Sequence, residues 1–315
     1  VVLVRFKNQR SHDHDRKTYL LTFPSDLSEE RVTAWLRAIS ATLRKGGVGR
    51  ITGVPTIAFE TWATDTGIVH RMKVAWSEGD YIARQLRLAG VNVVEDDGRP
   101  THKWTRGVEL GMKRPSRTLR IVNHADLSSS LLASIDTLEP NETVLLQWVL
   151  TPAMPEHPPA RDLHSKSDDF TLKALAHGVQ LAHHDEIEDR RKKLGEPNFL
   201  GVGRIAAFAK SEPRAIHLIN GVTRALLGGT NSNYNYFERQ PVRPHKLIQS
   251  VNEAAAPMFF PAQFSISELA GVVAWPIGEP MIAGLPNGPT RHLHATEDVP
   301  RVGRVLGHSN YPGHE

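Results

Sequence analysis

The run Thr56–Trp76, TIAFETWATDTGIVHRMKVAW, decides the fold class of this 315-residue chain. Two β-rich segments, Ile57–Trp62 and Ile68–Trp76, are joined by the short polar segment ATDTG (Ala63–Gly67). β-branched and aromatic residues on both sides of a Gly-containing turn are typical of a β-hairpin. The sequence therefore predicts two adjacent antiparallel strands at the centre of a first α/β unit.

Helices and strands flank this hairpin on both sides. Ser28 stands at an N-cap position, and the apolar residues after it recur at three- and four-residue spacing, which predicts one buried helix face. Ser77 is expected to cap a second helix, which Gly90 ends. Strands are expected at Tyr19–Phe23 and Val91–Val94. The resulting order, βαββαβ, is the ferredoxin-like pattern.

A second unit of the same order follows. We expect a helix capped by Asp126 and another that Ser211 caps. A Pro-rich loop and a helix-competent segment interrupt the unit. Its strands are expected at Val108–Leu110, Thr118–Val122, Val144–Leu150, Phe199–Ala209 and Tyr236–Val242.

The predicted fold is α+β, with two tandem ferredoxin-like sandwiches and an irregular C-terminal linker. The predicted organisation is a polar segment 1–16, a first domain 17–100, a second domain 101–250 with a helical insertion 151–197, and a linker 251–315. Pro and Gly in Trp275–Pro289 are too frequent for regular structure. Ser265 and Glu268 nevertheless fit the capping box of a short helix.

Composition sets broad limits on function. The chain is 40% hydrophobic and 23% charged, as expected for a globular protein, and its net charge of +4 is too small to indicate nucleic acid or an anionic membrane as a partner. The absence of cysteine excludes disulfides and Cys-ligated zinc. There is no run of about 18 apolar residues, so we expect no membrane span within the sequence.

Arginines are concentrated between Tyr81 and Arg120. A local group of basic side chains can contact DNA phosphates or an acidic partner. Acidic residues intervene, so a solvated face explains the same segment. The candidate DNA- or partner-facing residues are Arg84, Arg87, Arg114, Arg117 and Arg120.

Sixteen histidines raise the question of a metal site. The densest groups are HDH (His12–His14), His183 and His184 beside Asp185 and Glu186, and the pair His292 and His294. Because none of them has a third ligand at a recognised spacing, we expect surface histidines and no metal site.

Phosphate binding and catalysis have equally weak signals. The glycine run KGGVGRITG (Lys45–Gly53) follows a helix and lacks the Lys-Ser/Thr pair of a phosphate loop, and GVGR (Gly201–Arg204) lies inside a strand pattern. The spacing of the carboxylates Glu60, Asp65 and Asp80 does not indicate any particular reaction. We therefore expect no catalytic and no cofactor-binding residue in the chain.

Several segments together resemble a known family. They are Thr56–Trp76, RIAAFAKSEPRAIHLINGVTRALL (Arg204–Leu227), ISELAGVVAWP (Ile266–Pro276) and RVGRVLGHSNYPG (Arg301–Gly313). These segments are similar to the region upstream of the motor in the HerA/FtsK-like pumping ATPases of conjugative and type IV secretion systems, the actinobacterial conjugative DNA transfer proteins in particular.

The resemblance implies a non-catalytic assembly and substrate-docking region. No Walker A loop, G-x-x-x-x-G-K-[ST], occurs in the sequence, so ATP and Mg²⁺ are expected only in a motor domain of a longer parent ATPase. The implied partners are further copies of the full-length protein, secretion-system components or a DNA-processing complex, with weak DNA contact at most.

The resemblance also implies a location. Because the chain begins at Val1, we expect an excised piece whose upstream anchor holds it in the cytoplasm at the inner face of the plasma membrane. The alternative is a free-standing ligand- or RNA-binding protein built of tandem ferredoxin-like domains. Ferredoxin-like sheets bind RNA through aromatic side chains on an open face. An open face with exposed aromatic side chains would favour the RNA-binding hypothesis, and a covered face would favour the docking hypothesis.

Overall fold

The computed structural model describes residues 13, 16–44, 55–96, 102–136, 138–156, 184–230, 235–278, 280, 282 and 284–285. Several sequence features lie outside these residues. They include nearly all of the polar segment 1–16, the whole glycine run 45–53, most of the insertion 151–197, and the connector Arg301–Gly313. The expectations for these segments stay predictions.

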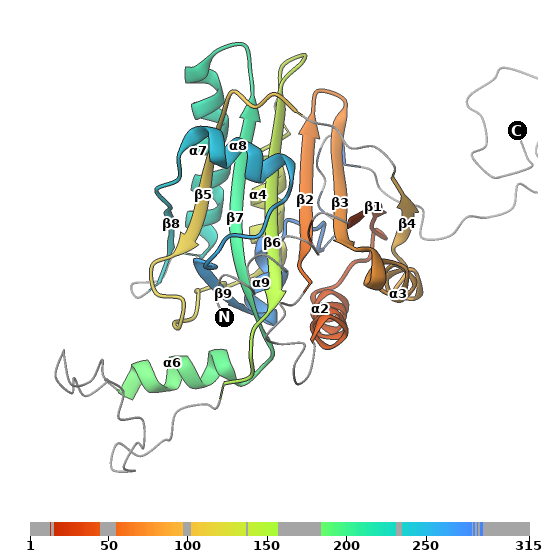
Figure 1. The fold of residues 1–315 in the computed structure, drawn as a ribbon, viewed down its shortest axis with the longest axis vertical. Coiled ribbons are helices and arrows are strands. Elements are labelled where there is room, and N and C mark those ends of the chain that lie inside the picture. The colour runs from red at the N-terminus through yellow and green to blue at the C-terminus, as the bar shows by residue number, and fades with distance from the viewer. Residues whose placement is uncertain are drawn as a thin grey trace, which may run out of the picture.

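The described residues form one antiparallel sheet of nine strands and seven helices, which confirms the α+β class (Figure 1). The strands are β1 (Arg16–Thr22), β2 (Ile57–Thr64), β3 (Gly67–Ala75), β4 (Asn92–Glu95), β5 (Arg106–Met112), β6 (Thr143–Pro152), β7 (Asn198–Phe208), β8 (Phe237–Arg239) and β9 (Ala262–Ser265). Their order across the sheet is β4-β1-β3-β2-β6-β7-β5-β8, and β9 pairs with β7.

Strands β2 and β6 join the two halves of the chain. They pair without interruption from Ile57↔Leu150 to Thr64↔Thr143. Every residue of β6 is buried, and so is all of β2 except its last residue. The prediction of two separate sandwiches is therefore corrected, because two strands that are buried on both faces pair with each other and continue one sheet.

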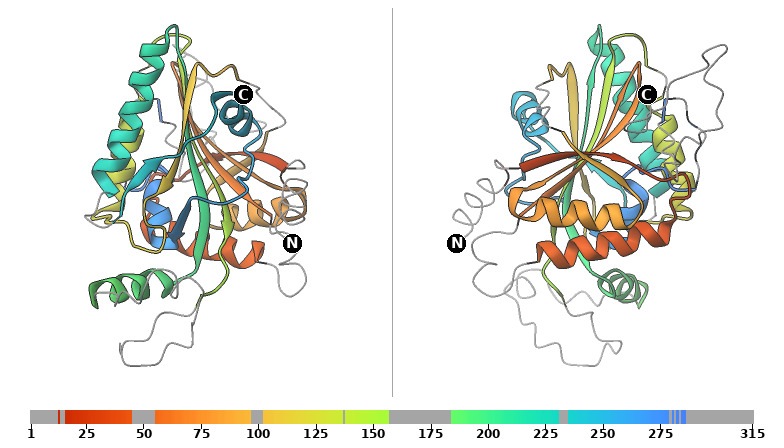
Figure 2. Two further views of the ribbon diagram at one scale, coloured as in Figure 1. Left: turned by 60° about the vertical axis from the view of Figure 1, so that its left-hand side comes forward. Right: turned by 90° about the vertical axis from the view of Figure 1, so that its right-hand side faces the viewer.

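Different layers cover the two faces of the sheet (Figure 2). The helices are α2 (Glu29–Leu43), α3 (Trp76–Leu88), α4 (His124–Ala133), α6 (His184–Leu194), α7 (Glu212–Thr230), α8 (Pro244–Asn252) and α9 (Ile266–Val272). Helices α2, α3, α4, α7 and α9 contribute to the main core around Trp148. Helix α8 packs on the opposite face, where its Leu247 and Val251 meet Trp62 and Trp104.

The local signals of the first half are confirmed. The Ser28 hydroxyl accepts a hydrogen bond from the Arg31 backbone at 3.4 Å, and the predicted apolar face of α2 is buried. Strands β2 and β3 form the expected hairpin. Gly90, at φ +87°, follows the end of α3 in the left-handed conformation that glycine adopts without strain. Helix α3, however, begins at Trp76, so Ser77 lies inside it and is not its cap.

Two expectations for the second half are wrong. Asn123, and not Asp126, caps α4, because its side chain accepts hydrogen bonds from the backbone of Ala125 and Asp126 at 2.9 and 3.3 Å. The segment Thr118–Val122 is not a strand. Its backbone is satisfied by tertiary partners: Leu119 donates to the Glu268 carboxylate at 2.6 Å. Because these partners are distant in sequence, the local pattern alone could not show that this segment does not pair as a strand.

The expected linker 251–315 is also corrected in its described part. Strand β9 pairs with the first residues of β7, Asn198–Gly201, whereas β5 pairs with the later ones, and α9 packs in the main core. The capping box on Ser265 is confirmed, since Glu268 and Ser265 bond each other's backbone at 2.9 and 3.3 Å. The Trp148 indole donates to the Val272 carbonyl at 2.8 Å. This segment is therefore an integral part of the fold up to at least Gly278.

Candidate functional site

A row of polar side chains crosses the centre of the α8 face of the sheet. The register places Arg71, Glu60, Gln147, Arg204 and Glu109 side by side on five consecutive strands, β3, β2, β6, β7 and β5. Gln147 lies at the junction of the two halves, and its amide donates to Glu60 at 2.8 Å while its oxygen accepts from Arg204 at 3.2 Å. The row therefore links the two halves by side chains as well as by backbone.

Arg204 is the most heavily bonded member of this row. Its guanidinium lies 2.9 Å from the Glu109 carboxylate and donates to the carbonyls of Ser250 and Ala255 at 3.1 and 2.7 Å. Burial lowers the pKa of Arg204, and the Glu109 charge opposes that shift. These carbonyls lie at the C-terminal end of α8 and just after it, where a cation is favourable. Arg204 thus fixes α8 over the sheet.

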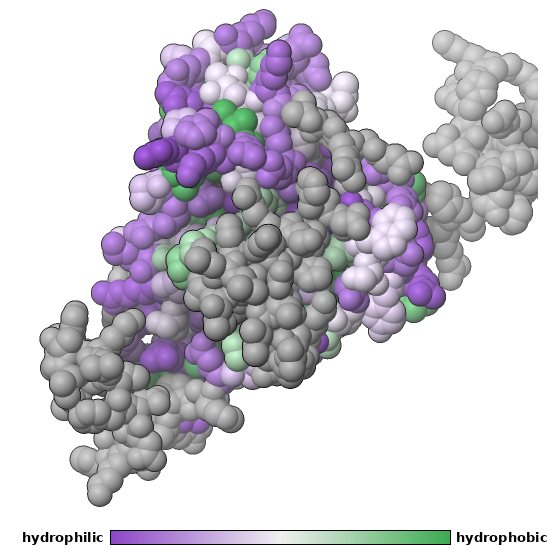
Figure 3. Space-filling model, in the orientation of Figure 1, coloured by the Kyte–Doolittle hydropathy of each residue, from purple (hydrophilic) through white to green (hydrophobic). Residues whose placement is uncertain are grey.

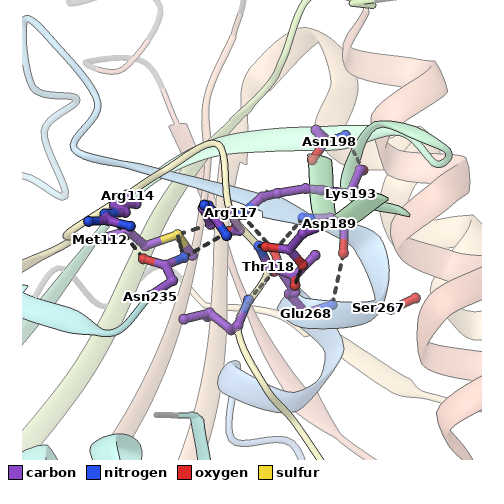
Figure 4. A network of polar contacts seen from close by, with 12 residues as sticks. Met112, Arg114, Arg117, Thr118, Asp189, Lys193, Asn198, Asn235, Ser267 and Glu268 are labelled. Atoms are coloured by element: carbon purple, nitrogen blue, oxygen red, sulfur yellow. Dashed lines mark hydrogen bonds and ion pairs between the residues drawn. The ribbon is translucent and has the colours of Figure 1, made fainter. Parts of the chain in front are cut away.

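A second network holds the insertion helix α6 against the body of the protein (Figure 4). The ammonium group of Lys193, which is fully buried, lies 3.2 Å from the Glu268 carboxylate and donates to the Arg117 carbonyl at 2.7 Å. Glu268 is the third residue of α9. Asp189, on the same α6, accepts hydrogen bonds from Thr118. Three segments distant in sequence meet at this point.

Burial acts on both members of the Lys193–Glu268 pair. It lowers the pKa of Lys193 and raises the pKa of Glu268, and each charge opposes the shift of the other. Glu268 also accepts two backbone hydrogen bonds, from Leu119 and Ser265, that favour its ionised form. The pair therefore holds two elements together, and the loss of either partner would leave the other buried without its counter-charge.

The candidate arginines of α3 are exposed at the β4 end of the sheet. Arg84 donates to a backbone carbonyl of its own helix. Arg87 donates two hydrogen bonds, at 3.2 and 2.8 Å, to the Val93 carbonyl on the edge strand β4. Acidic side chains lie beside them: Asp80 and Glu95 both contact Lys17, at 2.9 and 3.5 Å. This end of the molecule thus carries charges of both signs.

The other three candidates lie after β5, near the opposite end of the sheet. Arg114 and Arg120 are exposed. Arg117 is buried, and its guanidinium lies 2.8 Å from the Glu186 carboxylate of α6. The structure therefore does not bring the five candidate arginines into one surface, and it uses Arg117 to hold the insertion.

The candidate carboxylates also lie apart. Glu60 is buried and lies 2.8 Å from the Lys73 ammonium, Asp65 accepts from the Asn141 backbone at 3.3 Å, and Asp80 accepts from Tyr19 at 3.0 Å. Within the described residues no group of three His, Asp or Glu side chains could hold a metal ion. The candidate histidines 12, 14, 183, 292 and 294 lie outside those residues, and the side chain of His184 is also outside them.

The GVGR glycines serve packing. A Cβ atom at Gly203 would lie 2.5 Å from the Trp148 ring, and one at Gly201 would lie 2.7 Å from Leu150. Real Cβ atoms do not approach other heavy atoms to less than 3 Å. Both positions therefore require glycine, so that the large side chains of the neighbouring strand can pack against the backbone of β7. The interpretation of GVGR as part of a strand with small residues therefore accounts for the motif, and no phosphate site is needed to explain it.

Sequence reasoning missed the residues that carry both networks. As a candidate site residue, Arg204 was considered only as part of the GVGR motif, Lys193 was not singled out, and Glu268 was predicted only as half of a helix capping box. One signal was present for Arg204: a lone arginine in an otherwise apolar strand, FLGVGRIAAFA, indicates a buried charge that needs a partner.

Comparison with known proteins gives no family. No protein-family model matches this chain, and no curated protein matches it.

Proposed function

We propose that this chain is a non-catalytic docking and assembly platform of a DNA- or protein-pumping ATPase from a conjugation or type IV secretion system. The proposal joins the sequence resemblance to one observation: helix α8 covers the centre of the sheet face that an RNA-binding ferredoxin-like protein would leave open. Trp62 and Trp104, two large aromatic side chains on that face, are only 7% and 6% exposed. They pack under α8 and are not free to stack on bases.

The internal use of charge supports a mechanical role. Arg204 ties α8 to the sheet, and Lys193 ties the insertion to α9. Buried ion pairs specify one arrangement of elements at a cost in desolvation. A platform that passes force or contacts from one segment to another needs such fixed joints, and here they connect elements far apart in the sequence.

We further propose that each half is a ferredoxin-like unit and that the two are fused at β2 and β6. In the first half the order is β4-β1-β3-β2, and in the second it is β8-β5-β7-β6, so the fourth, first, third and second strands are neighbours in both. Glu60 and Gln147 occupy matching places at the junction, and Arg71 and Arg204 match on the next strands outward. In both halves a Ser-Glu pair follows at the start of the next helix. Ser77 and Glu78 lie in the first turn of α3, and Ser211 and Glu212 stand at the start of α7.

Photo-cross-linking of the protein in its native cells tests the proposed role. A photoreactive residue replaces exposed Leu88 on α3 or exposed Met154 beyond β6, and the cross-linked products are identified by mass spectrometry. We expect protein components of a secretion or conjugation apparatus and further copies of the same protein. Cross-links to RNA alone, or binding of MgATP to this chain with micromolar affinity, would contradict the proposal.

A further inference from the structure

A groove of about 330 Å³ lies between α7 and the strands β5 and β8. Its apolar lining comes from three side chains, Leu110, Leu227 and Phe237, of which Leu110 and Phe237 are buried. The groove lies along β8, the last strand of the sheet, which pairs only with β5 among the described strands. Its volume is within the range of small-ligand sites and suits one or two side chains of a bound segment.

Two guanidinium groups line the same groove. Arg224 and Arg239 are both exposed, and no carboxylate is among the residues that line the groove. Arg239 donates to the side chain of Asn220, a residue of α7, at 2.6 Å. Glu238, its neighbour on β8, instead lies 3.4 Å from the Lys113 ammonium. Among the described residues, neither Arg224 nor Arg239 forms an ion pair with a carboxylate.

The rest of the groove lining is polar: besides the two arginines it comprises Asn220 and Thr223. In the view of Figure 3, small apolar areas lie among hydrophilic side chains over the part of the molecule where Figure 1 shows α7, α8 and β8. An apolar floor beside two guanidinium groups that have no carboxylate partner among the described residues is an amphipathic site, because each part favours a different group of the same ligand.

We propose that this groove binds an acidic peptide segment of a partner protein, with a carboxylate on Arg224 and Arg239 and a neighbouring apolar side chain on the floor. Charge complementarity selects an anion, and the floor selects an apolar group next to it. A nucleic acid would require a longer basic track without an apolar floor. The inference deepens the proposed docking function by naming a partner class, and it rests on that function.

Fluorescence anisotropy with the whole chain tests the groove. The probe is a fluorescein-labelled peptide, GSEFELSG, and the comparison peptides are GSKFKLSG, with inverted charge, and GSESESSG, without apolar residues. We expect GSEFELSG to bind most tightly and to weaken as KCl rises from about 50 to about 500 mM. Arg224→Glu and Arg239→Glu should each weaken its binding by about fivefold or more.

Arg37→Glu is the matched control, because Arg37 is an exposed arginine of helix α2, in the first half of the chain. It should bind GSEFELSG as the unchanged protein does. Equal binding by the Arg224→Glu and Arg239→Glu variants, equal binding of GSKFKLSG, or full displacement by millimolar inorganic phosphate would overturn the inference. If the peptide does not bind but secretion-system proteins are cross-linked, the groove proposal is wrong and the proposed function stands. If the peptide binds but no such protein is cross-linked, the proposed role in a pumping ATPase is wrong and the groove proposal stands.

Discussion

At the scale of single residues, the interior of this protein contains charges that serve as joints. Arg204 shows the principle: its side chain is 1% exposed, and its guanidinium donates to one carboxylate, one amide oxygen and two carbonyls from four separate residues. Desolvation of such a group is costly, so its partners must all be present in the folded state. The sequence shows the arginine but not which residues will become its partners. For this reason the apolar pattern predicted the strand but not the network.

Replacing Arg204 by methionine should destabilise the protein strongly. The change keeps most of the side-chain volume but leaves Glu109 buried without its counter-charge and two carbonyls without donors. We expect a loss of about 3–5 kcal/mol in the free energy of unfolding, measured by urea denaturation.

The control for Arg204 is Arg106→Met. Arg106 makes a comparable contact with Glu212, but on the surface, where its side chain is 41% exposed. Its loss should cost about 1 kcal/mol or less. Similar losses for the two variants would show that Arg204 is not a structural joint.

His70 gives a pH-dependent prediction. Burial lowers the pKa of His70 to about 3, and its Nε2 has no hydrogen-bond partner among the described residues. The unfolded chain therefore takes up this proton first, near pH 6.5, and the folded state loses stability as pH falls below that value. Between pH 7.5 and pH 5 the loss from this group is about 2 kcal/mol.

His70→Gln should remove that part of the pH dependence. The measurement is the free energy of urea unfolding at pH 7.5 and pH 5 for both proteins, with the difference between the two pH values compared. The absolute stability of the variant does not enter this difference. An unchanged difference in the variant would mean that His70 is not buried in its neutral form.

At the scale of elements, the sequence predicted what local patterns encode. Helix α2 with Ser28 as its cap and the β2–β3 hairpin follow from spacing, turn residues and caps. Helix α8 was missed: it begins at Pro244, a favourable first helical residue, but only two of its side chains, Leu247 and Val251, are buried. Strand β9 is four residues long, and its pairing with β7 depends on a chain distant in sequence.

Helix α6 should loosen when its buried lysine is lost. In Lys193→Met, Glu268 keeps its backbone donors but loses its cationic partner, and the Arg117 carbonyl loses a donor. Hydrogen exchange followed by mass spectrometry should show faster exchange in α6 than in the unchanged protein, with a smaller effect in β7.

Lys192→Met supplies the comparison for α6. Lys192 is the exposed neighbour on the same helix, and its side chain makes no hydrogen bond or ion pair with another described residue. Its substitution should leave the exchange of α6 amides almost unchanged. If both variants exchange alike, the Lys193–Glu268 pair does not anchor the insertion.

At the scale of the whole molecule, the continuous sheet is the feature that the sequence did not reveal. Both halves were predicted as separate units because each contains a complete βαββαβ pattern. The two junction strands are buried on both faces and mostly apolar, as an inner strand is in any sheet, so their sequences do not show which strand lies next to them. Only the register of β2 on β6 shows that one core spans both halves.

One core implies one cooperative unfolding unit, and this can be tested across the junction. Leu86 of α3 is fully buried and packs in the first half. Leu86→Ala should cost about 2–5 kcal/mol. If the halves unfold together, the most protected amides of β7, in the second half, lose the same free energy of exchange as those of β1. Native-state hydrogen exchange measures both strands in one experiment. Protection of β7 that does not change, while β1 loses its own, would show two independent units within one sheet.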